Sequence, residues 1–377
     1  MNGIRTVLIV GGGIAGLTAA NALARQGVAC DVLELYDRPA GAAITIQNRA
    51  VDGLQEIGVL DRFLEAGVPR SPQDFFAYYD AAGTPIATPP MPPRPRDELP
   101  QAIVIHRVPL ARILREAAAA AGVNVQVGLS ISGLTENPDS VTATLTDGSE
   151  RSYDLVVGAD GVRSATRSLV FGDEVVPRYS GTTMFRWIIP DVPAVGPVGF
   201  YQSPSALIVV VRLRDGSIYL ATGRHYPDKP GRIPADEARQ IVRDNLAAFT
   251  APLMVELHKR LTDDSQIIIN DYDWLLTPNP WYRGRVLLIG DAAHATTATL
   301  ASGGGMAIED GVVLGQEIGA GGTVAEVLER FMKRRFERAR LVVETSVELD
   351  RMLQRGAPIP AQNELRAQAT GVLTTPY

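Results

Sequence analysis

The chain has 377 residues, a formal net charge of −6 and a pI near 5.4. This acidic balance argues against nucleic acid or an anionic membrane as its main partner, and no apolar stretch approaches the ~20 residues of a membrane span. The single cysteine, Cys30, excludes an internal disulfide and a cysteine metal cluster, and we expect no metal site. With no signal peptide in view, we expect a cytoplasmic protein, either a monomer or a homodimer.

The first predicted element is a buried strand over residues 4–10 that runs into a glycine turn and a helix. Gly11, Gly13 and Gly16 have the G-x-G-x-x-G spacing of a dinucleotide-binding turn, with Ala15 inside it. Such a turn can also be purely structural. The next strand, however, ends in Glu34, about 20 residues on, where a ribose hydroxyl needs an acceptor. A carboxylate there argues against a 2′-phosphate, so the pattern predicts the adenosine of FAD or NAD.

The following elements continue to alternate strands and helices. Asn48 is placed to cap a helix that ends near Ile57, and the proline-dense residues 89–100 predict a surface loop. Several strand-like runs between about 179 and 223 favour an inserted antiparallel sheet. We expect the tail from Ala357 to be poorly ordered. Predicted strands cover 29–34, 73–80, 84–88, 101–106, 123–128, 131–136, 141–146, 153–158, 180–190, 196–202, 205–213, 216–223, 266–274 and 285–291. Predicted helices cover 14–26, 48–57, 107–121, 305–318 and 323–355, and a pair of helices is predicted over 235–260.

This order of elements predicts an α/β protein. We expect a Rossmann-like FAD-binding domain, an inserted antiparallel-sheet substrate domain and a long C-terminal helix. No second G-x-G-x-x-G follows a strand, so a nicotinamide cofactor has no Rossmann domain of its own. The nucleotide domain is assigned residues 1–72, 101–178 and 280–322, the sheet domain residues 73–100 and 179–279, and the C-terminal helix and tail residues 323–377.

Three motifs in order carry a family resemblance. The first is the glycine turn with Glu34, the second is residues 158–164 (GADGVRS), and the third is residues 290–294 (GDAAH) with the glycines at 303–305. Together they resemble the group A flavoprotein monooxygenases, the aromatic hydroxylases related to para-hydroxybenzoate hydroxylase. The likeness spans residue 4 to about 340.

The resemblance implies a set of FAD contacts. Glu34 binds the ribose, Arg38 and Arg107 match FAD-contacting arginines, and Asp291 holds the ribityl chain or the pyrophosphate. Backbone N–H groups of Gly304, Gly305 and Met306 face the pyrimidine edge of the flavin, where a helix N-terminus also stabilises negative charge. Asp160 matches a motif for flavin and nicotinamide nucleotides, although it also suits a capped turn. His294 is assigned a structural hydrogen bond and no catalytic role.

The resemblance also implies the reaction. NAD(P)H reduces FAD, O2 forms a flavin C4a-hydroperoxide, and this transfers OH to a small aromatic or heteroaromatic substrate. Relatives carry a proline where this chain has Ala298, and often a glutamine where it has Ser302. We therefore expect a less rigid loop here.

The substrate pocket is expected to draw on the inserted sheet. Arg186 is the catalytic candidate, paired with an anionic substrate group or acting beside the flavin, and a salt bridge between domains is the alternative. Met184, Trp187, Tyr201 and Ala298 are the pocket candidates. A flavin reductase that does not use oxygen shares all three motifs and is the runner-up function. A flavin-dependent halogenase is disfavoured, because no lysine precedes Lys229.

Overall fold

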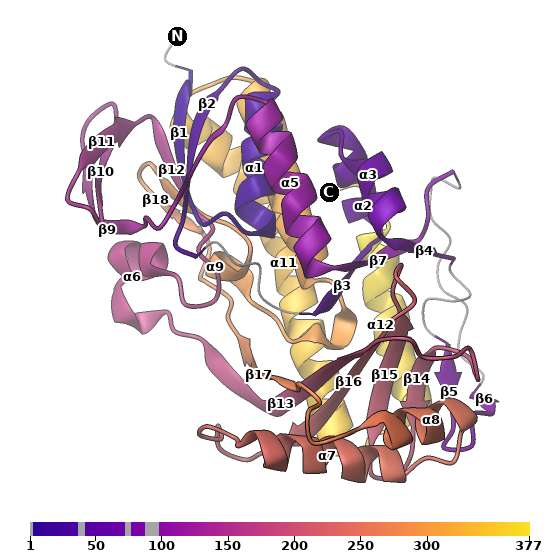
Figure 1. The fold of residues 1–377 in the computed structure, drawn as a ribbon. Coiled ribbons are helices and arrows are strands. Elements are labelled where there is room, and N and C mark those ends of the chain that lie inside the picture. The colour runs from indigo at the N-terminus through magenta and orange to yellow at the C-terminus, as the bar shows by residue number, and fades with distance from the viewer. Residues whose placement is uncertain (1–2, 37–41, 72–76, 87–97) are drawn as a thin grey trace.

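The fold, taken from a computed structural model, describes residues 3–36, 42–71, 77–86 and 98–377. Two large sheets dominate it (Figure 1). A six-stranded sheet lies in the upper part of the view, and a seven-stranded sheet lies below it. The long helix α11 (Val324–Gln354) runs from one region to the other.

The six-stranded sheet has the order β18-β19-β12-β1-β2-β8. It is parallel except for the edge strand β18, which pairs antiparallel with β19. Its central strands are almost continuously apolar because both faces are buried, one under helices and the other mainly under a small antiparallel sheet that includes Ile131, Val141 and Tyr153. The parallel order places the carboxyl ends of β1 and β12 side by side, where the first two glycine motifs begin. The strands are β1 (Thr6–Val10), β2 (Ala29–Glu34), β8 (Asn124–Val127), β12 (Leu155–Gly158), β18 (Tyr282–Arg283) and β19 (Val286–Leu288).

Helices α1 (Ile14–Ala24) and α10 (Gly303–Gly319) pack closely together beside this sheet. Glycine permits the approach: a Cβ on Gly311 would lie 2.5 Å from the backbone nitrogen of Ala19, and one on Gly315 would lie 2.7 Å from the Cβ of Ala22. The further helices of this part are α2 (Arg49–Glu56), α3 (Leu60–Ala66), α5 (Arg107–Ala120), α6 (Ala165–Phe171) and α9 (Asp291–His294).

Two small antiparallel sheets flank the large one, with the orders β11-β10-β9 and β3-β7-β4. The second carries the chain into α5, because β7 ends where α5 begins. Their strands are β3 (Ala43–Gln47), β4 (Val68–Arg70), β7 (Ala102–His106), β9 (Ile131–Glu136), β10 (Val141–Leu145) and β11 (Glu150–Tyr153).

The seven-stranded sheet has the order β17-β13-β16-β15-β14-β5-β6 and is mostly antiparallel, with one parallel pair, β14 and β5. Helices α7 and α8 cover its lower face in Figure 1 and bury a second apolar core there. The predicted inserted sheet is thus present, and it includes the predicted hairpin before residue 87. Its elements are β5 (Tyr78–Tyr79), β6 (Pro85–Ile86), β13 (Arg178–Ile189), β14 (Gly199–Gln202), β15 (Leu207–Arg212), β16 (Ile218–His225), α7 (Ala235–Ala247), α8 (Pro252–Arg260) and β17 (Ile268–Trp274).

The C-terminal tail differs from its prediction. Residues expected to be poorly ordered form α12 (Ile359–Leu373), which packs against α11. The buried Arg338 of α11 donates hydrogen bonds to the carbonyl oxygens of Val372 and Leu373. The helix escaped prediction because much of its buried face is polar, so the sequence lacks the apolar stripe of an amphipathic helix.

Other local predictions also need correction. Asn48 stands at the N-cap of α2, but its side chain does not cap the helix; its Oδ1 accepts a hydrogen bond from Gln101 instead. The short helices α3 and α6 and the 3-10 turns Gly172–Glu174 and Ala298–Leu300 were not expected. Among the residues described, none of the helices is both long enough and apolar enough to cross a membrane.

Candidate functional site

The glycine turn after β1 has the backbone geometry that a phosphate group needs. Gly11 has φ +109°, and a Cβ there would lie 2.3 Å from the Ala159 carbonyl oxygen. A Cβ on Gly16 would lie 1.9 Å from the Gly11 carbonyl oxygen, so both positions require glycine. Gly13 is different, because its Cβ would meet no atom within 4 Å. Gly13 is also exposed beside Ala15 at the start of α1, so an anion can approach the free N–H groups there.

Glu34 ends β2 directly beside this turn. Its Oε2 accepts a hydrogen bond of 2.8 Å from the Gly12 N–H, and its Oε1 accepts one of 3.1 Å from the Tyr36 N–H. These contacts fix the carboxylate while leaving further lone pairs for a ligand hydroxyl. Glu34 is half-buried, so one side of it remains open to solvent. The arginine predicted nearby, Arg38, lies outside the described residues.

The Asp160 carboxylate accepts hydrogen bonds from nearby residues of its own turn. Its Oδ2 accepts hydrogen bonds from the backbone N–H and the hydroxyl of Thr166, and its Oδ1 accepts one from the Ser164 hydroxyl. Ser164 in turn caps α6. The carboxylate therefore stabilises the turn between β12 and α6, as expected if Asp160 belongs to a capped turn.

Charged residues from three distant stretches of the chain lie within electrostatic range of Arg107 or include it. Asp291 begins α9 after β19, Arg107 begins α5, and Arg186 comes from β13 of the large sheet. Desolvation lowers the pKa of Arg107, with the Asp291 charge opposing and the Arg186 charge adding to this shift. Desolvation likewise raises the pKa of Asp291, opposed by His294 and Arg107. Asp291 and Arg107 are nevertheless exposed to solvent, so both remain accessible to a ligand.

Arg186 is held by neutral partners. Its Nε donates to the Tyr219 hydroxyl at 3.1 Å, its Nη1 donates to the Asn270 side-chain oxygen, and its guanidinium lies 5.9 Å from the ring centre of Tyr272. Burial lowers the pKa of Arg186, but Tyr219 and Tyr272 more than offset this, so its pKa lies above the ordinary value. Within the described residues no carboxylate forms an ion pair with it, which leaves its charge for another group.

The N-terminus of α10 supplies backbone donors, but they begin one residue earlier than predicted. The Met306 N–H donates to the Ser302 carbonyl oxygen at 2.9 Å and closes the first helical turn. The Met306 N–H is therefore not an open donor, and the prediction for this residue is wrong. The open N–H groups at this helix end are those of Gly303, Gly304 and Gly305. The Met306 side chain is buried against α11 and α12.

A residue that sequence analysis missed holds the loop before α10. Gln47, at the end of β3, donates from its amide nitrogen to the carbonyl oxygens of Leu300 and Ala301 and to the Ser302 hydroxyl. Ala298 lies exposed in this loop, at the start of a 3-10 turn. Gln47 is more than 250 residues away in sequence, so no local pattern indicates the contact.

Strand alternation divides the pocket candidates between two faces. Trp187 is 4% exposed and Tyr201 fully buried, and both pack into the core beneath α7 and α8. Both side chains point away from Arg186, so the prediction that they line the substrate pocket is wrong. Met184 and Arg186 lie on the opposite face, since side chains alternate along a strand. Half-buried apolar side chains accompany them on that face: Ile188, Phe200, Val209 and Val211.

His294 is confirmed as a structural residue. It is 2% exposed, its Nε2 lies 2.6 Å from Asp310 Oδ2, and its ring lies against Trp281. The Gly290 N–H also donates to Asp310, so this buried pair fixes the turn that presents Asp291.

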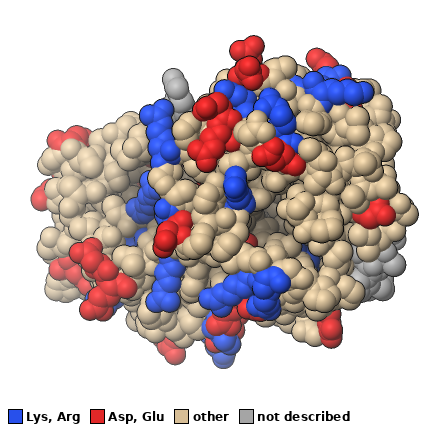
Figure 2. All heavy atoms as spheres, turned by 90° about the horizontal axis from the view of Figure 1, so that it is seen from below, with Lys and Arg blue, Asp and Glu red and all other residues tan. Residues whose placement is uncertain are grey.

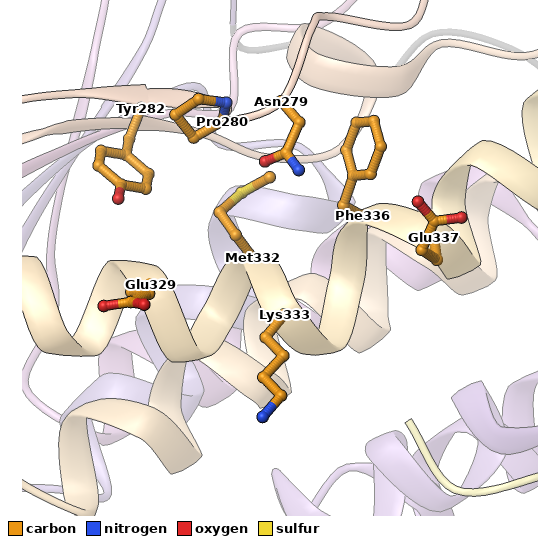
Figure 3. Close-up of a pocket in the computed structure, with 8 residues that line it drawn as sticks. All are labelled: Asn279, Pro280, Tyr282, Glu329, Met332, Lys333, Phe336 and Glu337. Carbon is orange, nitrogen blue, oxygen red and sulfur yellow. The ribbon is translucent and has the colours of Figure 1, made fainter.

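A hollow of about 270 Å³ lies elsewhere, between α11 and the segment before β18 (Figure 3). Phe336 and Met332 face Asn279 and Pro280 there, while Lys333 points outward. None of the candidate residues lines it. On the face shown in Figure 2, basic and acidic side chains are interspersed over the surface.

Comparison with known proteins gives consistent matches over most of the chain. The family model described as FAD binding domain matches residues 5–346. Aurachin C monooxygenase/isomerase of Stigmatella aurantiaca is 31% identical, over 89% of this chain and 86% of its own. The 2-heptyl-3-hydroxy-4(1H)-quinolone synthase of Pseudomonas aeruginosa is 30% identical, over 94% and 91%. The solved structure of Klebsiella pneumoniae HpxO complexed with FAD and uric acid superposes with a TM-score of 0.83 at 25% identity, covering 98% and 96%.

Proposed function

The chain belongs to the FAD-binding family of flavoprotein monooxygenases, and from that premise we propose that it hydroxylates an aromatic or heteroaromatic ring beside Arg186, using NAD(P)H and O2. It is an FAD-dependent monooxygenase. The observation that supports the proposed site is that Arg107, in the nucleotide-binding part, lies within electrostatic range of both Asp291 and Arg186, and Arg186 comes from the large sheet.

The residues present fit FAD. We assign the adenosine ribose to Glu34 and the pyrophosphate to the open position at Gly13, with Asp291 and Arg107 nearer the ribityl chain. The donors of Gly303, Gly304 and Gly305 are assigned to the pyrimidine edge of the flavin. When bound and reduced, FAD supplies the activation of O2.

Within this arrangement the protein contributes charge and exclusion of water. Arg186 and Arg107 place positive charge beside the assigned substrate position, which favours the anionic form of a substrate phenol or enol and so enriches its ring in electrons. Tyr219 and Asn270 hold Arg186 in position. The apolar face of the large sheet keeps water from the ring.

The names of relatives narrow the substrate class. A quinolone and uric acid are both nitrogen heterocycles, and the half-buried apolar face suits a flat ring. We therefore propose a nitrogen heterocycle that carries a hydroxyl or keto group. We retain the three-part division into nucleotide domain, sheet domain and C-terminal helices, a cytoplasmic location, and a monomer or homodimer as proposals.

The test is product analysis with purified protein. The FAD-loaded protein is offered 4-quinolones, hydroxybenzoates and urate with NADH or NADPH under 18O2. We expect a substrate that accelerates NAD(P)H oxidation and gains one 18O atom. Reduction of the substrate without 18O incorporation, at unchanged rate in anaerobic buffer, would support the oxygen-independent reductase instead.

A further inference from the structure

A buried arginine on α12 is unlike the other buried arginines of the chain. Arg335 binds Glu309 and Asp310, Arg338 binds Glu309, and Arg167 donates to three carbonyl oxygens. Arg366 is only 5% exposed, yet its one hydrogen bond to the described part of the chain is a 3.3 Å contact from Nη1 to the Asn363 amide oxygen. A buried cation without a counter-charge destabilises the folded state, so its retention needs a reason.

The groups around Arg366 are hydrogen-bond donors that have no acceptor. The Arg366 Nε, the Asn363 Nδ2 and the Tyr78 hydroxyl are all buried without a partner in the described structure. Arg366 lies 6.0 Å from the ring centre of Tyr78, and Asn363 is its hydrogen-bond neighbour. Burial raises the pKa of Tyr78, so the phenol remains protonated and donates. A guanidinium, an amide and a phenol that all lack acceptors match an anionic oxygen group, above all a carboxylate.

The register of the large sheet connects this cluster to Arg186. Tyr78 pairs with Phe200, Phe200 with Val209, Val209 with Ala221, and Ala221 with Arg186. Paired residues share one face of a sheet, so the five side chains form one row across five strands. The row is apolar in the middle and ends near a guanidinium on each side. Four strand spacings give it a length of roughly 19 Å.

Resting on the proposed function, we propose that Arg366, with Asn363 and Tyr78, binds a carboxylate at the far end of an elongated substrate whose ring is hydroxylated beside Arg186. The apolar row accommodates the linking part of the substrate. A simple benzoate is too short to reach both ends, whereas a bicyclic ring with a chain of about seven atoms spans the row.

The test compares matched ligands by calorimetry on the FAD-loaded protein. The ligands are 2-heptyl-4-quinolone and 4-quinolones whose 2-alkyl chains of three, five or seven carbons end in a carboxylate. We expect the seven-carbon acid to bind at least tenfold more tightly than heptylquinolone, and the three-carbon acid to show no gain over its methyl-ended analogue.

The variants are Arg366→Met and Arg366→Lys, with Arg338→Met as the matched control on a paired buried arginine. Arg366→Met should abolish the preference for the acid, leave heptylquinolone and FAD affinity unchanged, and preserve or raise the Tm. Arg366→Lys should retain part of the preference, and Arg338→Met should lower the Tm by several degrees. An unchanged preference in Arg366→Met, or no preference in the wild type, overturns the inference while 18O incorporation still supports the proposed function. Failure to bind either ligand or to incorporate 18O overturns both.

Discussion

The carbonyl oxygen of Gly11 lies 1.9 Å from the place that a Cβ on Gly16 would occupy, whereas a Cβ on Gly13 would meet nothing within 4 Å. The same motif therefore contains glycines needed by the fold and a glycine kept for a ligand. Gly13 has φ −82°, which any residue adopts, so backbone strain does not explain it.

Gly13→Ala should separate folding from cofactor binding. We expect the Tm of the apoprotein to change by less than about 3 °C, because the methyl group enters open space. FAD affinity should fall at least tenfold, because the methyl group occupies the assigned position of the pyrophosphate. Differential scanning fluorimetry and flavin titration measure the two effects. Gly16→Ala is the contrasting variant and should lose both stability and FAD, and equal Tm losses in the two variants would contradict the assignment.

Glu34→Ala should weaken FAD binding while preserving the fold. A hydrogen bond to a charged group contributes about 1.5–3 kcal/mol, so we expect a loss of roughly 10- to 150-fold in affinity. Quenching of flavin fluorescence during titration measures it. Glu364→Ala, at an exposed position of α12, is the control and should bind FAD as the wild type does. An unaltered dissociation constant for Glu34→Ala would remove this residue from the cofactor site.

Arg186→Met should affect the reaction far more than stability. Its described partners are neutral, so no ion pair is broken, and we expect the Tm to change little. Coupling of NAD(P)H oxidation to oxygenated product should fall at least tenfold, since the charge beside the ring is lost. The ratio of product to NAD(P)H consumed measures this. The control is Arg178→Met, which changes another arginine of β13 that lies over the ring of Trp274. Unchanged coupling in Arg186→Met would show that Arg186 has only a structural role.

Ala298→Pro should be tolerated. The preceding Thr297 has φ −65° and ψ 157°, which suit a residue before proline, and Ala298 is exposed at the first position of its 3-10 turn. We expect a gain of about 0.4–1 kcal/mol through a less flexible unfolded chain. Urea denaturation measures it, and a loss greater than 1 kcal/mol would show that the Ala298 N–H has a partner that proline removes.

The buried Asp310 should make stability sensitive to strong acid. Burial opposes ionisation, but His294, Arg335 and the Gly290 N–H together lower its pKa from 3.8 to about 2. A lowered folded-state pKa stabilises the protein above pH 3.8, and this stabilisation is lost as the pH falls towards 2. The shift corresponds to about 2 kcal/mol. In Asp310→Asn the denaturation midpoint should depend less on pH between pH 4 and 2 than it does in the wild type. An unchanged pH dependence in this variant would refute the assignment.

The sequence was informative where chemistry depends on local spacing. The glycine turn, Glu34, the β-rich inserted sheet and the structural role of His294 all follow from short motifs or from period-two patterns. It was uninformative where partners are distant. Gln47 acts on a loop some 250 residues later, and α12 is fixed to α11 by hydrogen bonds from Arg338 as well as by a short run of apolar contacts. Trp187 and Tyr201 show a further limit, because alternation says that residues differ in face but not which face is the core.

The alternation along β13 separates two kinds of sequence freedom. Phe185, Trp187 and Ile189 maintain the packing under α7 and α8, while Met184, Arg186 and Ile188 face the opposite way. Evolution, or a combinatorial library, is thus able to revise ligand preference at every second position without disturbing the scaffold. Deleting a single residue in the middle of β13 would exchange the two sets, so that Arg186 would point into the apolar core and Trp187 towards the proposed substrate.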